Sequence, residues 1–349
     1  MRGMGLALLL APGLADAFPI PRAGAEIPVE WSEPLLELGT WERRGAQIHH
    51  VPSEQRRSFI ISRATTRGLT RLQLERTDAD VVAIDRDPEA GARANELGAR
   101  FGDRFRFVQR NYSELASLGL SGVDVVFYDL GISSFHVDDA RRGFSFRKDA
   151  PLDMRMNPDE GRSAAEFLET APHDELVKAV RDYGEEKNWK SIVGAMEEAR
   201  GTGNLSRTVS LAHLIESVTP ARQRRKSRGI HPATRAFQGI RMAVNAELDH
   251  LRQSLPAAFE TLSANGRVVV ISFHSLEDRI VKRQFREWAG FPVDANDSTP
   301  RQDRHIVGNL ITRKPVRPGE AEVARNPRSR SALLRVFEKM EAREPGGGS

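Results

Sequence analysis

Apolar runs and helical stretches take turns along the middle of the chain. Residues 81–84, 105–109 and 123–128 are short, apolar or β-branched runs with the length of strands, and the last is the most hydrophobic, as in a strand buried on both faces. An Ala-, Glu- and Arg-rich stretch after the first run has the composition of a helix. Strands that alternate with helices predict an α/β fold with a parallel, doubly wound sheet.

The alternation stops after residue 134 and a helical pattern replaces it. Residues 163–218 read as amphipathic helices, which we interpret as an insertion into the sheet domain. Residues 232–259 are predicted to form one long helix, because their apolar residues keep a three- and four-residue spacing. Its other face carries Arg235, Gln238, Arg241 and Asn245. Strands at 268–271 and 333–337 are expected to complete the sheet.

These patterns divide the 349 residues into a core and an insertion. The predicted segments are a leader (1–25), the core (26–137 and 230–340), the helical insertion (138–229) and a flexible tail (341–349). The leader reads as a targeting signal, because an apolar stretch follows Arg2, or as a misassigned start. Within the core, residues 39–77 are atypical, since strand and helix signals are mixed there.

The amino-acid composition excludes several kinds of active site and metal site. The sequence has no cysteine, which excludes disulfides, cysteine-bound zinc, iron–sulfur clusters and a thiolate nucleophile. Lys and Arg number 52 against 48 acidic residues, and a pI near 9.5 favours a polyanionic partner. No apolar run reaches the ~18 residues of a membrane helix. We therefore expect no membrane partner and a cytoplasmic protein, or a plastid or mitochondrial one if the leader is a targeting signal.

Two predicted strands end in aspartate, at the position where α/β sheets bind ligands. Asp85 could accept both ribose hydroxyls of an adenosine cofactor, and both NAD and S-adenosylmethionine fit that geometry. Alternatively, Asp85 and Asp87 only cap the following helix. Asp129 closes the most hydrophobic strand, and Gly131 permits a turn with close backbone approach. An ordinary Asp-Gly turn remains the alternative there.

The sequence around this turn contains several stretches that resemble one protein family. The stretches that carry the resemblance are 138–146, 151–156, 183–187, 231–238, 271–279 and 326–331. In order and spacing they resemble the small-subunit (16S) rRNA cytosine-N4 methyltransferase family of bacteria and organelles, of the MraW type. The resemblance spans roughly residues 80 to 340.

The resemblance implies a Rossmann-like, class I S-adenosylmethionine methyltransferase with an inserted helical domain that recognises the substrate. Such an enzyme methylates N4 of a cytidine in the decoding region, so its partner is small-subunit rRNA or the small ribosomal subunit. The oligomeric state stays open, a homodimer included. The lack of cysteine agrees with this, since methylation of a pyrimidine ring carbon normally needs a thiolate adduct.

Site residues follow from the same motifs. The implied catalytic residues are Asp129, Ser133 and Ser134, and the implied cofactor-binding residues are Asp85, Tyr112, Asp129, His136 and Gly68. Tyr112 stands where the family usually has Phe, and His136 where it has Gln. Acceptors at the Asp129 turn are expected to hold the cytosine amine while it attacks the sulfonium methyl directly.

The family's glycine-rich cofactor loop is the part that is missing. It should precede Asp85 by roughly two dozen residues, yet only Gly68 and Thr70 match the pattern there. Loss of pattern between intact flanks suggests a frameshift or a misassigned exon. If the segment is genuine, the alternative is a catalytically impaired homologue that acts as an RNA-binding ribosome-assembly factor. The same gap argues against a nicotinamide-dependent oxidoreductase, which needs G-x-G-x-x-G.

A basic run at 222–228 suits contact with RNA phosphates, with a solvated loop as the alternative. The predicted RNA-binding residues are Arg224, Arg225, Lys226, Arg228 and Arg235.

Residues 275–278 predict a capping box that opens a helix through Arg283. We prefer this interpretation to metal ligation by His274, Glu277 and Asp278. We expect no metal site.

Overall fold

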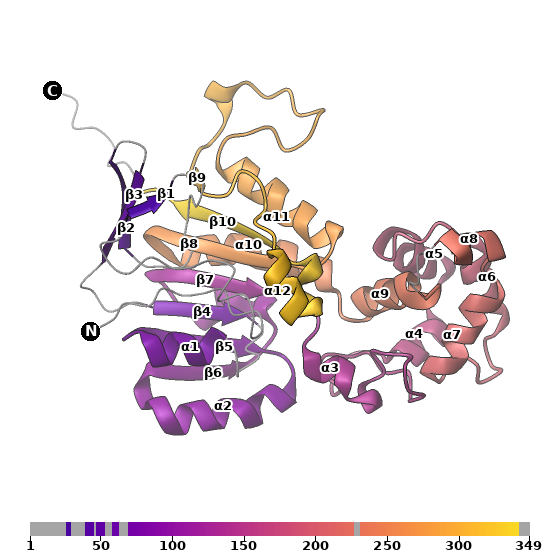
Figure 1. The fold of residues 1–349 in the computed structure, drawn as a ribbon. Coiled ribbons are helices and arrows are strands. Elements are labelled where there is room, and N and C mark those ends of the chain that lie inside the picture. Colours follow the sequence, from indigo (N-terminus) through magenta and orange to yellow (C-terminus); the bar gives the residue numbers. More distant parts are fainter. Residues whose placement is uncertain are drawn as a thin grey trace. The chain divides into compact units, whose positions relative to one another are not determined.

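A computed structural model describes residues 26–28, 39–44, 47–52, 58–62, 69–226 and 231–341 (Figure 1). The described chain forms two compact units. Unit 1 holds the residues up to Gly131 and those from His250 onward, and unit 2 holds Ile132–Asp249. The predicted helical insertion, 138–229, lies inside unit 2. The two units are described separately below.

The main feature of unit 1 is a seven-stranded sheet in the order β6-β5-β4-β7-β8-β10-β9. Its strands are β4 (Ser58–Ser62), β5 (Asp80–Asp85), β6 (Phe105–Gln109), β7 (Val123–Asp129), β8 (Leu262–Ser272), β9 (Gly308–Leu310) and β10 (Leu333–Lys339). Strands β6, β5, β4, β7 and β8 are parallel, while β10 runs antiparallel to both of its neighbours. The predicted doubly wound α/β sheet is confirmed.

Helices cover both faces of this sheet (Figure 1). On one face, α1 (Leu69–Arg76) and α2 (Pro88–Phe101) contribute Leu74, Ala94 and Leu97 to a core shared with Val125 and Phe127 of β7. On the other face, α10 (Glu247–Thr261), α11 (Ser275–Trp288) and the 3₁₀ helix η4 (Tyr112–Leu118) pack on the alternate residues of β7. Strand β7 is therefore buried on both sides, as its hydrophobic sequence predicts.

Strand β4, which lies within the atypical segment 39–77, has a central place in this sheet. Strand β4 pairs with β5 on one side and with β7 on the other, and Phe59, Ile60 and Ile61 are buried. Upstream, β1 (Glu26–Pro28), β2 (Gly39–Arg44) and β3 (Gln47–Pro52) form a separate antiparallel sheet in the order β1-β3-β2.

Unit 2 is helical. Its α-helices are α3 (Ser134–Asp138), α4 (Ala164–Thr170), α5 (His173–Val177), α6 (Trp189–Glu198), α7 (Thr208–Ser217), α8 (Ala221–Lys226) and α9 (Ala233–Val244), with a π-helical turn, η6 (Lys178–Tyr183), after α5. Helix α9 buries Phe237 and Ile240 in the core of this unit. It also packs closely on η6, because a Cβ on Gly239 would lie only 2.0 Å from the carbonyl oxygen of Ala179.

The single helix predicted over 232–259 is wrong. The chain breaks between α9 and α10 at Asn245 and Ala246, where Ala246 has a φ of 48°. A left-handed residue cannot continue a right-handed helix. The side chain of Asn245 is also buried and bonded to a neighbouring loop, as described below, so it does not stay on a solvent-facing polar side.

Within the described part of the chain, no helix is both long and apolar enough to cross a membrane.

Two short helices, α12 (Glu320–Arg325) and the 3₁₀ helix η8 (Pro327–Ser331), precede the last strand, β10. Two further short 3₁₀ helices of unit 1 are η3 (Gly102–Arg104) and η7 (Arg301–Asp303), and unit 2 adds η5 (Ala140–Arg142).

Candidate active site

The sheet register brings two predicted site residues to one edge of unit 1. Ser62, the last residue of β4, pairs with Ile84 of β5 and with Tyr128 of β7. Asp85 is the residue after Ile84, and Asp129 is the residue after Tyr128. Both aspartates therefore stand just beyond the carboxyl end of β4. Strand order reverses at β4, and such a switch point is where open α/β sheets bind ligands.

Asp85 closes β5 and is buried, with 7% of its surface exposed. Its Oδ1 accepts a hydrogen bond of 2.9 Å from the backbone N–H of Asp87. Asp87 is the residue that caps α2, since its Oδ1 accepts from the N–H of Glu89 at 3.1 Å. The two aspartates therefore have different positions: Asp87 is the helix cap, and Asp85 shapes the turn between strand and helix.

Tyr112 provides an aromatic side chain next to this turn. It opens η4, three residues after Gln109, and Gln109 pairs with Asp85 across β6 and β5. Its ring stands edge-on to Tyr128, with centroids 5.7 Å apart and planes at 88°. Tyr128 is fully buried and donates its hydroxyl to the carbonyl oxygen of Ser254 at 3.2 Å. This burial raises the pKa of the Tyr128 phenol well above its usual value.

The Asp129 turn is held to the neighbouring strand. Asp129 pairs with Ile271 of β8, and the N–H of Leu130 donates to the carbonyl oxygen of Ile271 at 3.0 Å. Gly131 then adopts a φ of 83°, the left-handed region that favours glycine. The chain therefore turns away from β7 directly after Asp129, and Asp129 itself is half-buried.

Ser133 and His136 cap helix α3 reciprocally in unit 2. The N–H of His136 donates to Ser133 Oγ at 3.2 Å, and the N–H of Ser133 donates to His136 Nδ1 at 3.3 Å. Because Nδ1 accepts, the ring proton of a neutral His136 sits on Nε2. The imidazole also stacks on Phe144, with ring centroids 4.9 Å apart. Both capping residues are buried, so the fold gives each a structural role besides the predicted catalytic and cofactor roles.

Comparison with known proteins identifies the family. The model of the MraW methylase family matches residues 67–340. A ribosomal RNA small subunit methyltransferase H from Methylobacterium sp. (strain 4-46) is 44% identical over 274 residues, covering 77% of this chain and 80% of the relative. Its namesake from Nitrosomonas europaea is 44% identical over 289 residues, covering 78% of this chain and 88% of the relative. The chain belongs to the MraW methylase family.

Membership confirms the family predicted from the sequence motifs, and with it a class I methyltransferase fold for the seven-stranded sheet. The family match begins at residue 67 and so leaves out most of the atypical segment 39–77. Gly68, the predicted remnant of the cofactor loop, lies outside the described residues. The frameshift explanation stays a hypothesis. A nicotinamide-dependent oxidoreductase is set aside by the family.

The basic residues predicted to bind RNA are only partly described. Arg224 in α8 is exposed, with Nη1 3.7 Å from a carboxylate oxygen of Glu216. Arg235 in α9 is exposed and donates from Nη1 to the carbonyl oxygen of Glu185 at 3.4 Å. Residue Arg228, and the side chains of Arg225, Lys226 and Ser134, lie outside the described part of the chain.

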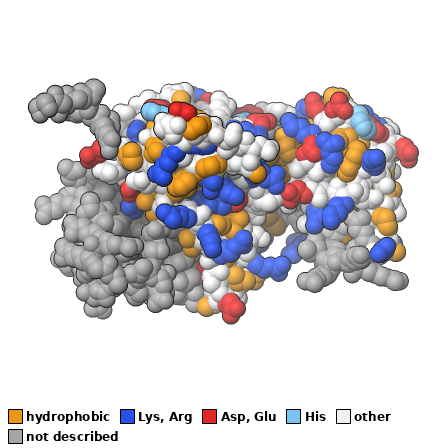
Figure 2. Space-filling model, turned by 90° about the horizontal axis from the view of Figure 1, so that it is seen from above, with side chains coloured by type: hydrophobic (Ala, Val, Ile, Leu, Met, Phe, Trp, Pro, Cys, Tyr) orange, Lys and Arg blue, Asp and Glu red, His pale blue; other side chains and the backbone are white. Residues whose placement is uncertain are grey.

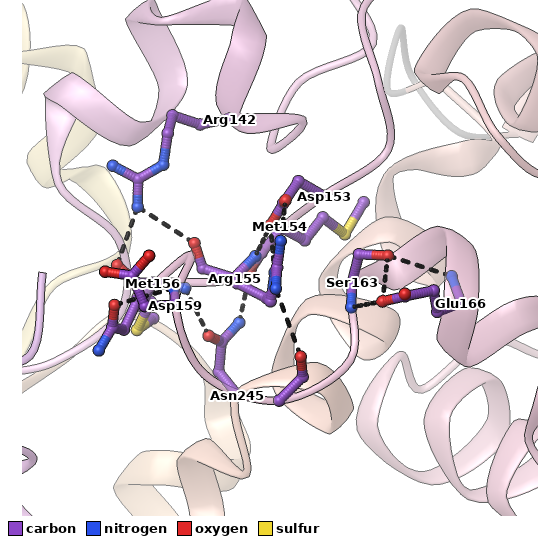
Figure 3. A network of polar contacts seen from close by, with 11 residues as sticks. Arg142, Asp153, Met154, Arg155, Met156, Asp159, Ser163, Glu166 and Asn245 are labelled. Atoms are coloured by element: carbon purple, nitrogen blue, oxygen red, sulfur yellow. Dashed lines mark hydrogen bonds and ion pairs between the residues drawn. The ribbon is translucent and has the colours of Figure 1, made fainter.

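A polar network in unit 2 fixes the family-specific loop 151–157 (Figure 3). Asn245 Oδ1 accepts from the N–H of Met156 at 2.8 Å, and its Nδ2 donates to the carbonyl oxygen of Met154 at 2.7 Å. Arg142 donates from Nη2 to the carbonyl oxygens of Arg155 and Met156. These bonds hold Met154 at a φ of 60°, a conformation that costs free energy for a residue other than glycine.

The roles of Asn245 and Arg142 in this network were not predicted from the sequence. No local sequence signal reveals the role of Asn245, because this residue keeps the spacing of the polar face of the predicted helix and the loop that it binds lies about 90 residues earlier.

Asp153 and Arg155 form the charged part of the network. The guanidinium of Arg155 donates from Nε to Oδ1 at 2.9 Å and from Nη2 to Oδ2 at 2.7 Å, while its own N–H also donates to Oδ1 (Figure 3). Burial by itself raises the pKa of the Asp153 carboxyl. The hydrogen bonds and positive charge of Arg155 outweigh that effect and hold the pKa below its usual value.

The capping prediction for 275–278 is wrong by one residue. The cap of α11 is His274, whose Nδ1 accepts from the N–H of Glu277 at 3.3 Å. Glu277 Oε2 in turn accepts from the N–H of Phe273 at 2.9 Å. An imidazole acceptor takes the place of the expected serine hydroxyl, so the helix begins at Ser275 directly after the carboxyl end of β8.

Proposed function

We propose that this chain transfers a methyl group from S-adenosylmethionine to the exocyclic N4 amine of a cytidine in small-subunit rRNA. The proposal is carried by the family match over residues 67–340, which includes both aspartates at the strand ends. It is supported by relatives named ribosomal RNA small subunit methyltransferase H, at 44% identity over more than three quarters of each of their chains.

The described residues suit an adenosine-containing methyl donor. Asp85 is a buried carboxylate at the end of the second strand of the sheet, where it can accept hydrogen bonds from ribose hydroxyls. Tyr112 offers an aromatic ring three residues beyond the register partner of Asp85. S-adenosylmethionine supplies an electrophilic methyl group on a sulfonium. We assign its nucleoside to the Asp85 side of β4 and its amino-acid end to the Asp129 side.

The reaction needs orientation of a weak nucleophile. The lone pair of the cytosine amine is delocalised into the ring, so the amine must be held and polarised. The carboxylate of Asp129 can accept a hydrogen bond from an N–H of that amine, and this places electron density on the attacking nitrogen. No covalent intermediate with the protein is required, in agreement with a sequence that has no cysteine.

The target position and the setting are the finer parts of the proposal. We assign the methylated cytidine to the decoding region, as the sequence resemblance implies, and take either free rRNA or the small ribosomal subunit as the substrate. We propose the cytoplasm as the place of action, with an organelle as the alternative if residues 1–25 are a targeting signal.

Mass spectrometry of rRNA tests the function. The chain is expressed in a bacterial strain that lacks its own enzyme for this modification, and small-subunit rRNA is digested to nucleosides. We expect N4-methylated cytidine to reappear. If the complemented strain contains none while the protein is expressed and folded, the active-enzyme proposal is wrong, and calorimetry with S-adenosylmethionine then shows whether cofactor binding is the step that is lost.

A further inference from the structure

The C-terminal part of unit 1 carries a concentration of positive charge. Residues 311–335 contain seven Arg and Lys side chains against two Glu. One of those glutamates, Glu322, is completely buried. The exposed cations are Arg313, Lys314, Arg317, Arg328 and Arg330, which we call the C-terminal basic rim. Blue Lys and Arg side chains also gather on the face of unit 1 seen in Figure 2.

Sheet register places this rim at the same edge as Asp129. Leu334 of β10 pairs with Ile271 of β8, and Ile271 pairs with Asp129 of β7. On its other side Leu334 bridges to Val316. Val316 and Asp129 therefore belong to one row across the sheet, separated by three strand spacings, or about 15 Å. Both segments of the rim, 313–317 and 328–330, adjoin the start of β10 and so lie at the carboxyl edge of the parallel strands.

The backbone that carries the rim is firmly held. Val316 and Leu334 exchange two backbone hydrogen bonds of 2.9 and 3.0 Å. In η8, Ser329 is buried between the two exposed arginines and donates from Oγ to the carbonyl oxygen of Asn326 at 2.8 Å. Cations on an ordered backbone lose less conformational freedom on binding than cations on a loose loop.

Within the part of the chain that the structure describes, most cations of the rim differ from neighbouring cations in that they have no carboxylate partner. Arg267, Arg304 and Arg335 are each paired with a carboxylate, and Arg335 binds Asp278 through two hydrogen bonds of 2.7 and 3.0 Å. Among the described residues, no carboxylate forms an ion pair with Arg313, Lys314, Arg317 or Arg330. These four cations of the rim therefore present positive charge that no carboxylate of the described chain neutralises.

We propose that the C-terminal basic rim binds backbone phosphates of the rRNA that flanks the methylated nucleotide. This inference rests on the proposed function, because it takes the rRNA as substrate. Arginine suits the occupant, since its planar guanidinium can donate two hydrogen bonds to one phosphate. Phosphate contacts fix register and orientation and carry no sequence information. The rim thus holds the strand across the edge at which Asp129 meets the reacting base.

The test compares two double variants with the same change in charge. Arg313→Gln with Arg330→Gln removes one cation from each segment of the rim. Arg100→Gln with Arg106→Gln removes two exposed cations near β6, at the opposite edge of the sheet. Affinity for a small-subunit rRNA fragment is measured against salt concentration, together with KM for the rRNA, kcat, and calorimetric Kd for S-adenosylmethionine.

We expect the rim variant to bind the fragment at least ~10-fold more weakly and to lower the salt slope by roughly 1.4 to 1.8, for two lost phosphate contacts. Its KM for rRNA should rise, while kcat and the cofactor Kd match those of the wild type. The control variant should keep the wild-type slope. Equal slopes and KM values in all three proteins would overturn the proposal and leave the rim as a solvated surface.

Two other results separate the alternatives. A rim variant that binds naked rRNA normally, but shows a raised KM only on assembled subunits, would assign the rim to a ribosomal protein and overturn the RNA proposal. Wild-type protein that methylates nothing would refute the proposed function. In that case the salt dependence of RNA binding would still show whether the rim binds RNA phosphates.

Discussion

Asp85 and Asp129 stand at the same level of the sheet on opposite sides of β4, each one residue beyond a register partner of Ser62. Neighbouring strands are about 4.8 Å apart, so the α-carbons of the two residues are separated by roughly 10 Å across the end of one strand. A single extended small molecule can reach both carboxylates. Substitution of Asp129 should therefore impair methyl transfer, and substitution of Asp85 should impair cofactor binding.

Asp129→Ala should abolish methyl transfer and leave the fold intact. The carboxylate is proposed to orient the attacking amine, and loss of one such preorganised group costs about 10²- to 10³-fold in kcat. Transfer to small-subunit rRNA is followed by mass spectrometry, and folding by thermal unfolding. Asp103→Ala, which removes an exposed carboxylate beside the far strand β6, serves as the control and should retain full activity. Activity of Asp129→Ala within 3-fold of the control would contradict the assignment.

Asp85→Ala should weaken binding of S-adenosylmethionine, whereas Asp87→Ala should weaken only the fold. Hydrogen bonds to a charged group contribute about 1.5–3 kcal/mol, so loss of the Asp85 carboxylate predicts a Kd roughly 10- to 150-fold higher. Asp87 caps α2, and its loss should cost about 1 kcal/mol of unfolding free energy. Calorimetry and urea unfolding measure the two effects. Equal cofactor affinities in the two variants would show that Asp85 is only a turn residue.

Gly143→Ala should destabilise unit 2 far more than Gly161→Ala. Both glycines have a φ near 70°, so both substitutions carry the left-handed strain of about 1–2 kcal/mol. At Gly143 a Cβ would in addition lie 2.5 Å from the backbone nitrogen of Asp153, while at Gly161 it would meet nothing within 4 Å. Thermal unfolding compares the variants. If both lose the same stability, the loop 151–157 is not packed against Gly143 as described.

Sequence pattern closely predicted three of the five parallel strands, β5, β6 and β7, because each is a short apolar run with a polar turn at its end. Residues 105–109 were predicted with the observed bounds, and β7 extends its prediction by one residue, to Asp129. The turn at Gly131 was predicted for the same reason, since a left-handed residue after a buried strand strongly favours glycine.

Other features depend on contacts between residues far apart in sequence. The break at Ala246 follows from bonds of Asn245 to a loop about 90 residues earlier, and no helical periodicity encodes it. The cap at His274 was missed because histidine is not among the preferred capping residues. The central position of β4 is also non-local, since it is defined by its pairing with β5 and β7.

The Asp153–Arg155 pair should make the stability of unit 2 depend on acid pH. The folded-state pKa of Asp153 is lowered below the usual value of about 3.9, because Arg155 outweighs the effect of burial. A lowered pKa means that the pair contributes stability above the unfolded-state pKa and loses it as the pH falls through the folded-state pKa. Urea unfolding of the wild type and Asp153→Asn should therefore differ at pH 7, with the wild type more stable, and the two curves should converge as the pH falls below the folded-state pKa. Asp159→Asn, a substitution in the same loop region, should follow the wild-type curve over the same pH range. A difference between wild type and Asp153→Asn that persists unchanged at low pH would mean that packing, and not the ion pair, gives Asp153 its effect.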